Sequence, residues 1–257
     1  SVENKGFFLI TIDGEGDNLW NRPRYITVKN ADALARFQML CEAYGFKTTY
    51  LTDFELAQAP SFRELGRNIL KRGTGEIGMH LHAWNTPPLV PLTVDDFYFQ
   101  PYLMDYPEEL IRQKVATMTG LLEDTFNTKI LSHRAGRWAI NKTYARILAE
   151  YGYCIDCSVT PHIVWTLREK DENQTQIVDY TGYPDEPYFM DLGETGQQGR
   201  TTLLEVPMTI VALGGRFRKS IHKVIGKVGI AGRLIRRFYP EHMWLRPRKG
   251  NLGSLLK

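Results

Sequence analysis

GFFLITID at residues 6–13 is an apolar run of strand length, and ADALARFQMLCEAYG at residues 31–45 has the apolar spacing of an amphipathic helix. The same alternation recurs along the chain. Further strands are predicted at 46–52, 76–82, 128–134 and 153–159, further helices at 62–73, 107–126 and 141–152, and a Pro-rich, aromatic loop at 87–106. Strands separated by helices of about a dozen residues are typical of βα units, in which the strands run parallel.

Polar residues gather at the carboxyl ends of these predicted strands. They are Asp13, Glu15, Asp17, His80, His82, His133, Arg134 and Asp156. In a barrel all strand ends face one mouth, whereas an open doubly wound sheet gathers only the residues near its switch point. We therefore expect an α/β fold, a (β/α) barrel that is complete or incomplete, with the open sheet as the alternative. Past residue 165 the pattern loosens into a predicted polar loop at 166–176 and a strand within 201–211, and one domain over 1–257 is the simpler interpretation.

The composition is that of an ordinary globular protein. The 257 residues are 43% hydrophobic and 24% charged, and no run approaches the roughly 20 apolar residues that cross a bilayer. The start SVENKG lacks the layout of a signal peptide, so a cytoplasmic location is the default expectation. The three cysteines are too few for a disulfide framework, and Cys154 and Cys157 are interpreted as buried thiols of a strand rather than a redox motif.

Charge is divided unevenly along the chain. The segment 214–257 holds twelve Lys or Arg residues and one Glu, a net charge of +11, and the remainder carries a net charge of −8. Apolar residues at partly helical spacing in this segment predict either a peripheral contact with the inner membrane or a helix packed on the domain. Few aromatic residues are interleaved with these charges, so we expect no nucleic-acid partner.

EIGMHLHAWNT at residues 76–86 places two histidines one residue apart in a strand. Side chains alternate faces along an extended chain, so His80 and His82 share one side and point toward one spot. Imidazole is a common ligand of zinc and related metals. The pair therefore predicts two ligands of one metal ion, and the alternative is an exposed strand face that carries histidines without a metal.

TIDGEGD at residues 11–17 places three carboxylates at i, i+2 and i+4 after an apolar strand. Unpaired carboxylates near a buried strand end are costly, so a cation is expected among them. Asp13, Glu15 and Asp17 can supply a metal ligand and a base together. A solvated turn is the alternative, since Gly14 and Gly16 favour one.

These motifs, with SHRAGRW at 132–138 and YCIDCSV at 153–159, occur in the order seen in NodB-like polysaccharide deacetylases, carbohydrate esterase family 4. The chain resembles most the divergent branch associated with bacterial surface-polysaccharide biosynthesis, over roughly residues 7–210. The resemblance implies a distorted (β/α) barrel and one divalent metal, for which zinc is favoured. It also implies hydrolysis of an N-acyl group, acetyl or formyl, on a sugar of O-antigen or capsule biosynthesis, with a free or lipid-linked glycan as substrate.

The resemblance assigns a role to each matching position. Asp13 falls on the general base, Glu15 on the metal carboxylate with Asp17 as its rival, and His80 and His82 on the metal histidines. The family usually spaces those histidines four apart, and Trp84 stands at that second position here. Arg134 would orient Asp13, Asp156 would support the catalytic histidine, and Trp84, Arg137 and Trp138 would contact substrate.

One expected motif is missing. The family's general acid is a histidine in a Leu-x-His context near the C-terminus, and no such motif follows residue 211. Either the given chain stops short of that histidine, or His162 serves instead, or the domain binds a glycan without catalysing. The sequence therefore predicts a metal-dependent carbohydrate deacetylase, with a catalytically degenerate, metal-containing glycan-binding domain as the alternative.

Overall fold

The computed structural model describes residues 7–168, 175–212 and 242–246. The chain divides into two compact units, one formed by residues 1–158 with 188–206 and the other by residues 159–187 with 207–257. Each unit is described by itself.

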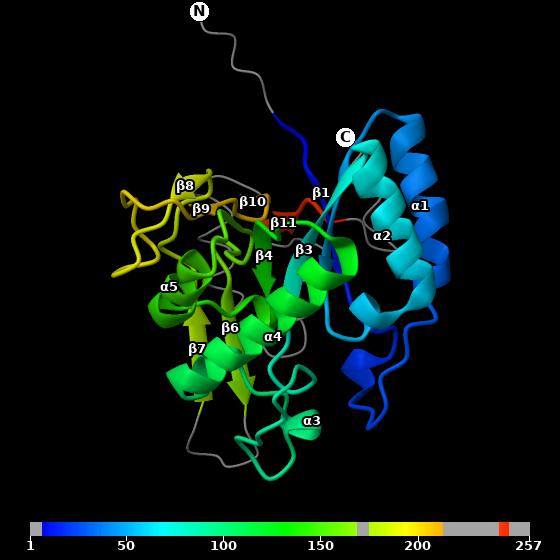
Figure 1. Cartoon of the computed structure of the whole chain (residues 1–257). Helices are drawn as coiled ribbons and strands as arrows, with labels where there is room; N and C mark the ends of the chain where they lie inside the picture. The colour runs from blue at the N-terminus through cyan, green and yellow to red at the C-terminus, as the bar shows by residue number, and fades with distance from the viewer. Residues whose placement is uncertain (1–6, 169–174, 213–241, 247–257) are drawn as a thin grey trace, which may run out of the picture. The chain divides into compact units, whose positions relative to one another are not determined.

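The first unit is built on a seven-stranded sheet in the order β1-β2-β3-β4-β5-β9-β8 (Figure 1). Its strands are β1 Ile10–Gly14, β2 Thr48–Thr52, β3 Gly75–Leu81, β4 Ser132–Ala135, β5 Ile155–Asp156, β8 Tyr188–Phe189 and β9 Leu204–Glu205. Neighbours from β1 to β9 pair in parallel, and β8 pairs antiparallel with β9. The expected α/β class with a parallel sheet is confirmed. Within the described residues β1 and β8 are the two edges of this sheet.

Helices connect the parallel strands, and local signals account for their ends. The α-helices are α1 Ala31–Ala43, α2 Pro60–Arg72, α3 Asp96–Phe99, α4 Glu108–Phe126 and α5 Lys142–Glu150. Short 3₁₀ turns lie at Leu19–Asn21, Leu56–Gln58, Leu103–Asp105 and Gly136–Trp138. Helix α2 begins at Pro60, whose fixed φ suits a first turn, and is capped at its end by Gly73 with φ 65°. The Asn141 side chain caps α5 by accepting a hydrogen bond from the Tyr144 amide.

The centre of the sheet is buried on both faces. Helices α1 and α2 lie side by side, and α4 contacts both α5 and β3. On β3 the neighbouring residues Met79 and His80 are both buried, although they point to opposite faces. His82, which follows the strand, is 1% exposed. The two histidines therefore do not lie on an exposed strand face.

Three sequence predictions differ from the structure. The stretch 87–106, predicted as a loop, contains α3, which Asp95 caps by accepting a hydrogen bond from the Tyr98 amide. The predicted loop 166–176 overlaps the ends of two paired strands, because cross-strand hydrogen bonds override its polar composition. Cys157 is buried as expected, whereas Cys154 is exposed.

The second unit contains two antiparallel pairs. Strand β6, Val164–Arg168, pairs with β7, Thr175–Asp179, and β10, Ile210–Ala212, pairs with β11, His242–Trp244. The Trp165 and Trp244 rings meet edge-on, with centroids 6.0 Å apart. Apart from residues 242–246, the basic segment 214–257 lies outside the described residues, and so does its predicted membrane contact. In the part of the chain that is described, no helix is long and apolar enough to cross a membrane.

Candidate metal centre

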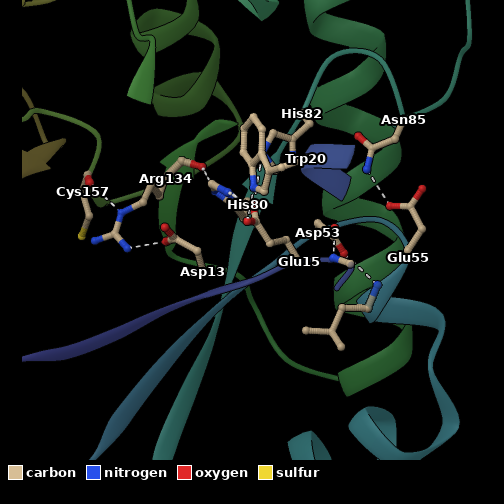
Figure 2. Close-up of polar contacts among 12 residues, drawn as sticks. Asp13, Glu15, Trp20, Asp53, Glu55, His80, His82, Asn85, Arg134 and Cys157 are labelled. Carbon is tan, nitrogen blue, oxygen red and sulfur yellow. Dashed lines mark hydrogen bonds and ion pairs between the residues drawn. The ribbon is translucent and has the colours of Figure 1, made fainter. Parts of the chain in front are cut away.

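Glu15, His80 and His82 converge on one point of the first unit (Figure 2). The Glu15 Oε2 atom lies 3.5 Å from His80 Nε2 and 3.5 Å from His82 Nε2. One ligand atom from each of the three residues lies within 4.8 Å of the other two. Glu15 follows β1 directly and the histidines come from the end of β3, so the carboxyl ends of two parallel strands on either side of β2 bring them together.

A backbone hydrogen bond fixes the orientation of His80. Its Nδ1 lies 2.9 Å from the carbonyl oxygen of Arg134 on the adjacent strand β4. A carbonyl only accepts, so Nδ1 carries the proton and Nε2 presents its lone pair to Glu15 when the ring is neutral. This arrangement is the usual outer-shell support of a metal-binding histidine.

The surroundings of the His82 ring show whether a metal ion suits this group of residues. Its ring is buried against the rings of Trp84 and Trp20, with centroids 4.8 Å and 5.6 Å away. Among the described residues, neither of its ring nitrogens has a hydrogen-bond partner. A buried polar atom without a partner is costly, and here Nε2 faces a carboxylate. Two imidazole lone pairs and one carboxylate facing each other form a donor set that suits a divalent cation such as zinc.

Three residues that the sequence analysis did not select hold Glu15 in place. The Trp20 Nε1–H donates to Glu15 Oε1 over 2.5 Å, and the Asn30 side chain donates to the Glu15 carbonyl over 2.8 Å. The buried carboxylate of Asp53 accepts hydrogen bonds from the amides of Gly16 (3.1 Å) and Leu56 (2.7 Å). These bonds leave Glu15 Oε2 aimed at the histidines. Of these three residues, Asp53 alone had a signal in the sequence, its position directly after the predicted strand 46–52.

The electrostatics of the cluster follow from burial and from the neighbouring charges. Burial, with the charges of His80 and Arg137, holds the pKa of His82 well below its ordinary value, so its ring is neutral. Burial also lowers the pKa of His80, but the adjacent Glu15 and Asp13 carboxylates outweigh it and raise that pKa. The pKa of Asp53 is raised to about 7, mainly by burial.

Asp13 and Arg134 form an ion pair beside the cluster, as Figure 2 shows. The guanidinium donates to Asp13 Oδ1 over 2.5 Å, to Thr11 Oγ1 over 2.8 Å and to the Cys157 carbonyl over 2.8 Å. It also lies over the Trp138 ring, 4.8 Å from the centroid. The side chain of Arg134 therefore holds Asp13 while its carbonyl orients His80.

Asp156 supports a histidine that the sequence analysis did not include among the site residues. Its Oδ1 accepts hydrogen bonds from His133 Nδ1 (2.6 Å) and Ser158 Oγ (2.8 Å). The other ring nitrogen of His133 lies 2.6 Å from the Tyr144 hydroxyl. His133, Asp156 and Tyr144 are fully buried, so this triad joins β4, β5 and α5 inside the unit.

The remaining predicted site residues are Asp17, Arg137 and His162, and each has partners of its own. The Asp17 carboxylate accepts from Thr27 Oγ1 (3.0 Å) and the Lys29 amide (2.7 Å), so it fixes the loop after β1. Arg137 donates to the Gln100 carbonyl and lies over the Tyr102 ring. His162 belongs to the second unit, where its Nε2 lies 3.8 Å from Asp185 Oδ2.

No protein-family model and no curated protein sequence matches this chain. Solved structures do match it. Its structural neighbours are polysaccharide deacetylases and family 4 carbohydrate esterases. A candidate polysaccharide deacetylase from Mycobacterium smegmatis is 15% identical with a TM-score of 0.49, and the alignment covers 88% of this chain and 72% of that one.

Two further solved structures align with a smaller share of this chain. A mutant of a family 4 pseudoenzyme with restored enzymatic activity, whose wild type comes from Bacillus anthracis, is 12% identical with a TM-score of 0.42. A Streptococcus pyogenes deacetylase in complex with acetate is 14% identical with a TM-score of 0.40. The alignments cover 62% and 63% of this chain, but only 47% and 57% of those chains, less than two thirds of their length.

Proposed function

We propose that this protein is a metal-dependent hydrolase that removes an N-acyl group from a sugar. The observation that carries the proposal is the convergence of Glu15, His80 and His82 beside the Asp13–Arg134 ion pair. The order of the four sequence motifs is independent support, because each motif supplies one part of this arrangement.

Glu15, His80 and His82 would hold the metal ion, which when bound would polarise the acyl carbonyl and acidify a water molecule. Three protein ligands leave room for substrate and water. Asp13 would accept the proton of the attacking water, and Arg134 keeps that carboxylate beside the cluster through its hydrogen bond to Oδ1. Zinc is the metal we propose, because two imidazoles and one carboxylate suit it.

The finer parts of the proposal rest on the motif resemblance. They are an acetyl or formyl leaving group, a sugar of O-antigen or capsule biosynthesis, and a cytoplasmic location with peripheral contact at the inner membrane. The substrate would be a carbohydrate, free or lipid-linked.

The departing amine also needs a proton donor. Of the six histidines in the chain, the three in the first unit are committed: His80 and His82 to the cluster, and His133 to hydrogen bonds at both ring nitrogens. This commitment favours a second candidate, a metal-containing domain that binds a glycan without hydrolysing it. His162 is the acid we propose for the catalytic case, since histidine is the side chain most often used for general acid–base catalysis.

The test is acyl release from N-acetyl and N-formyl amino-sugar glycosides by the full chain, stripped with a chelator and reloaded with Zn²⁺. Glu15→Gln should lose bound metal and activity together, because it removes the anionic ligand. Asp17→Asn is the matched control: it alters a carboxylate two residues away that bonds Thr27 and Lys29 instead, and it should keep both.

Two results would contradict the proposal. Absence of acyl release from every N-acylated glycoside by a metal-loaded protein that still binds them would establish the binding function instead. Equal loss of metal in the two variants would show that the cluster of Glu15 with the histidines is not the metal site.

A further inference from the structure

The turn Gly136–Trp138 lies directly against the candidate metal cluster in the first unit. A β-carbon on Gly136 would stand 2.5 Å from His82 Cδ2 and 2.5 Å from the Leu81 carbonyl oxygen, so glycine lets this turn approach the histidine closely. Arg137, the next residue, is therefore placed beside the cluster. Its charge reaches the histidine, since it adds to the effect of burial in lowering the pKa of His82.

Two arginines from distant parts of the chain lie on one short stretch at the end of α3. Arg137 Nη1 donates to the Gln100 carbonyl over 2.5 Å, and its guanidinium lies over the Tyr102 ring, 5.0 Å from the centroid. The Arg22 guanidinium lies over the Tyr98 ring, 4.5 Å from the centroid. Both positive groups are therefore gathered on five consecutive residues next to the cluster.

The charge of these two guanidiniums is not neutralised by an ion pair within the described residues, where neither has a carboxylate at ion-pair distance. Burial lowers the pKa of Arg137, and the nearby charge of Arg22 adds to this effect, which Tyr102 and the more distant Asp105 offset only in part. A partly buried cation is costly unless an anion accompanies it. An anion supplied by a ligand would therefore stabilise both arginines.

The backbone and the exposure of these residues also suit a binding site. Arg137 and Trp138 have φ of 58° and 62°, in the left-handed region that residues with a β-carbon rarely adopt. Such strained conformations cluster at active sites and ligand-binding sites. Arg22 is exposed and Arg137 is partly exposed, so a ligand can reach both from solvent. Their planar N–H forks match the paired oxygens of a carboxylate or a phosphate.

We propose that Arg22 and Arg137 bind an anionic group, a carboxylate or a phosphate, carried by the same substrate whose N-acyl sugar is placed at the cluster. The identity of that substrate rests on the proposed function. Its class is thereby narrowed to acidic amino sugars and amino-sugar phosphates. The position of Arg137 against the cluster favours a group on the substrate over a separate ligand. The anionic group should tighten binding about tenfold relative to a neutral sugar.

The test measures, by calorimetry, the affinity of three methyl glycosides for the metal-loaded full chain in the Asp13→Asn background, which should bind without turnover. They are those of N-acetylglucosamine, of its 6-phosphate and of N-acetylglucosaminuronic acid. At least one anionic glycoside should bind about tenfold more tightly than the neutral one, and this ratio should shrink in about 0.5 M salt. Preference for the carboxylate alone or for the phosphate alone would support the site and identify the group.

Removal of either arginine should remove the preference. Arg22→Gln and Arg137→Gln should each lower the affinity ratio by about threefold or more, because each deletes a charged donor to the anion. Circular dichroism checks the fold of both variants. Arg22 is exposed, so Arg22→Gln decides the question even where Arg137→Gln fails to fold.

Arg24→Gln is the matched control, because Arg24 is an exposed arginine two residues from Arg22 and its removal changes the net charge equally. It should keep the full affinity ratio. Equal affinity of the wild-type site residues for all three glycosides, or a ratio that survives both Arg22→Gln and Arg137→Gln, would overturn the inference. An equal loss in Arg24→Gln would assign the preference to the overall charge of the loop and also overturn it.

Acyl release is measured separately with the wild-type chain. Hydrolysis of the neutral and anionic glycosides with equal KM would retain the proposed function and reject the anion site. A preference for the anionic glycosides that depends on Arg22, without hydrolysis of any of them, would retain the anion site and reject the proposed function.

Discussion

Trp20→Phe should weaken the affinity for Zn²⁺ about tenfold. The substitution removes the hydrogen bond from Trp20 Nε1 to Glu15 Oε1, 2.5 Å long, which holds the carboxylate toward the histidines. A hydrogen bond to a charged group contributes about 1.5 to 3 kcal/mol, and the 49% exposure of Trp20 favours the lower end of that range. About 1.4 kcal/mol corresponds to a factor of ten in affinity. A phenylalanine ring can keep the contacts of Trp20 with the His82 and Trp84 rings, so the change isolates the hydrogen bond.

The assay is a competition titration of the metal-stripped protein against a chromogenic zinc chelator, with circular dichroism to confirm folding. Trp165→Phe is the matched control, because its Nε1 donates to Thr160 Oγ1 over 2.9 Å within the second unit. It removes the same kind of bond without touching Glu15 and should leave zinc affinity unchanged. An unchanged affinity in Trp20→Phe, or an equal loss in Trp165→Phe, would refute the argument that Trp20 positions a metal ligand.

Three further predictions follow from the same contacts. Asp13→Asn should abolish acyl release while metal content, measured by atomic emission, stays the same; loss of metal would make Asp13 a ligand instead of the base. Burial lowers the pKa of His133, so the folded state takes up its proton at lower pH than the unfolded state does. The free energy of unfolding should therefore fall as the pH drops below about 6.5. In urea denaturation the His133→Gln variant should show a weaker dependence of this free energy on pH. An equal dependence in the variant would assign the effect to other groups. Lys114→Met leaves the carbonyls of Ala83, Thr86 and Pro88 without their buried donor, so it should lower the free energy of unfolding by about 3 kcal/mol in urea denaturation. Lys129→Met changes an exposed lysine and should alter the free energy of unfolding little. Equal effects of the two substitutions would show that Lys114 does not hold segment 83–88 in place.

Much of the fold could be predicted from local sequence periods. The apolar runs and helical spacings located β1 to β5, α1, α2, α4 and α5 to within a few residues, since each element must bury one stripe or face. Strands β6, β7 and β8 escaped prediction. Strand β8 has two residues, and β6 and β7 border a polar stretch, so cross-strand pairing and not composition makes them strands.

The sequence predicted the main residues of the candidate site but not the side chains that hold them in place through hydrogen bonds. His80 and His82 share a strand face by local geometry alone, and Asp13 and Glu15 follow a strand end. Trp20 and Asp53 were missed because single residues of these types are common in cores and loops, and His133 was placed at a strand end without a role. Their roles appear only through bonds to Glu15, Gly16 and Asp156, two of which join segments 23 and 37 residues apart.

The sequence by itself determined the parallel α/β class and the common direction of the two histidines, because both follow from the periods of a strand and a helix. Only the tertiary structure decided that Glu15 and not Asp17 faces those histidines, and that Arg134 holds Asp13 across 121 residues of chain. These choices depend on the register of the parallel strands, in which Ile12 pairs with Tyr50 and His80 with Arg134. Register is set by packing and hydrogen bonds between segments far apart in sequence, which no local pattern contains.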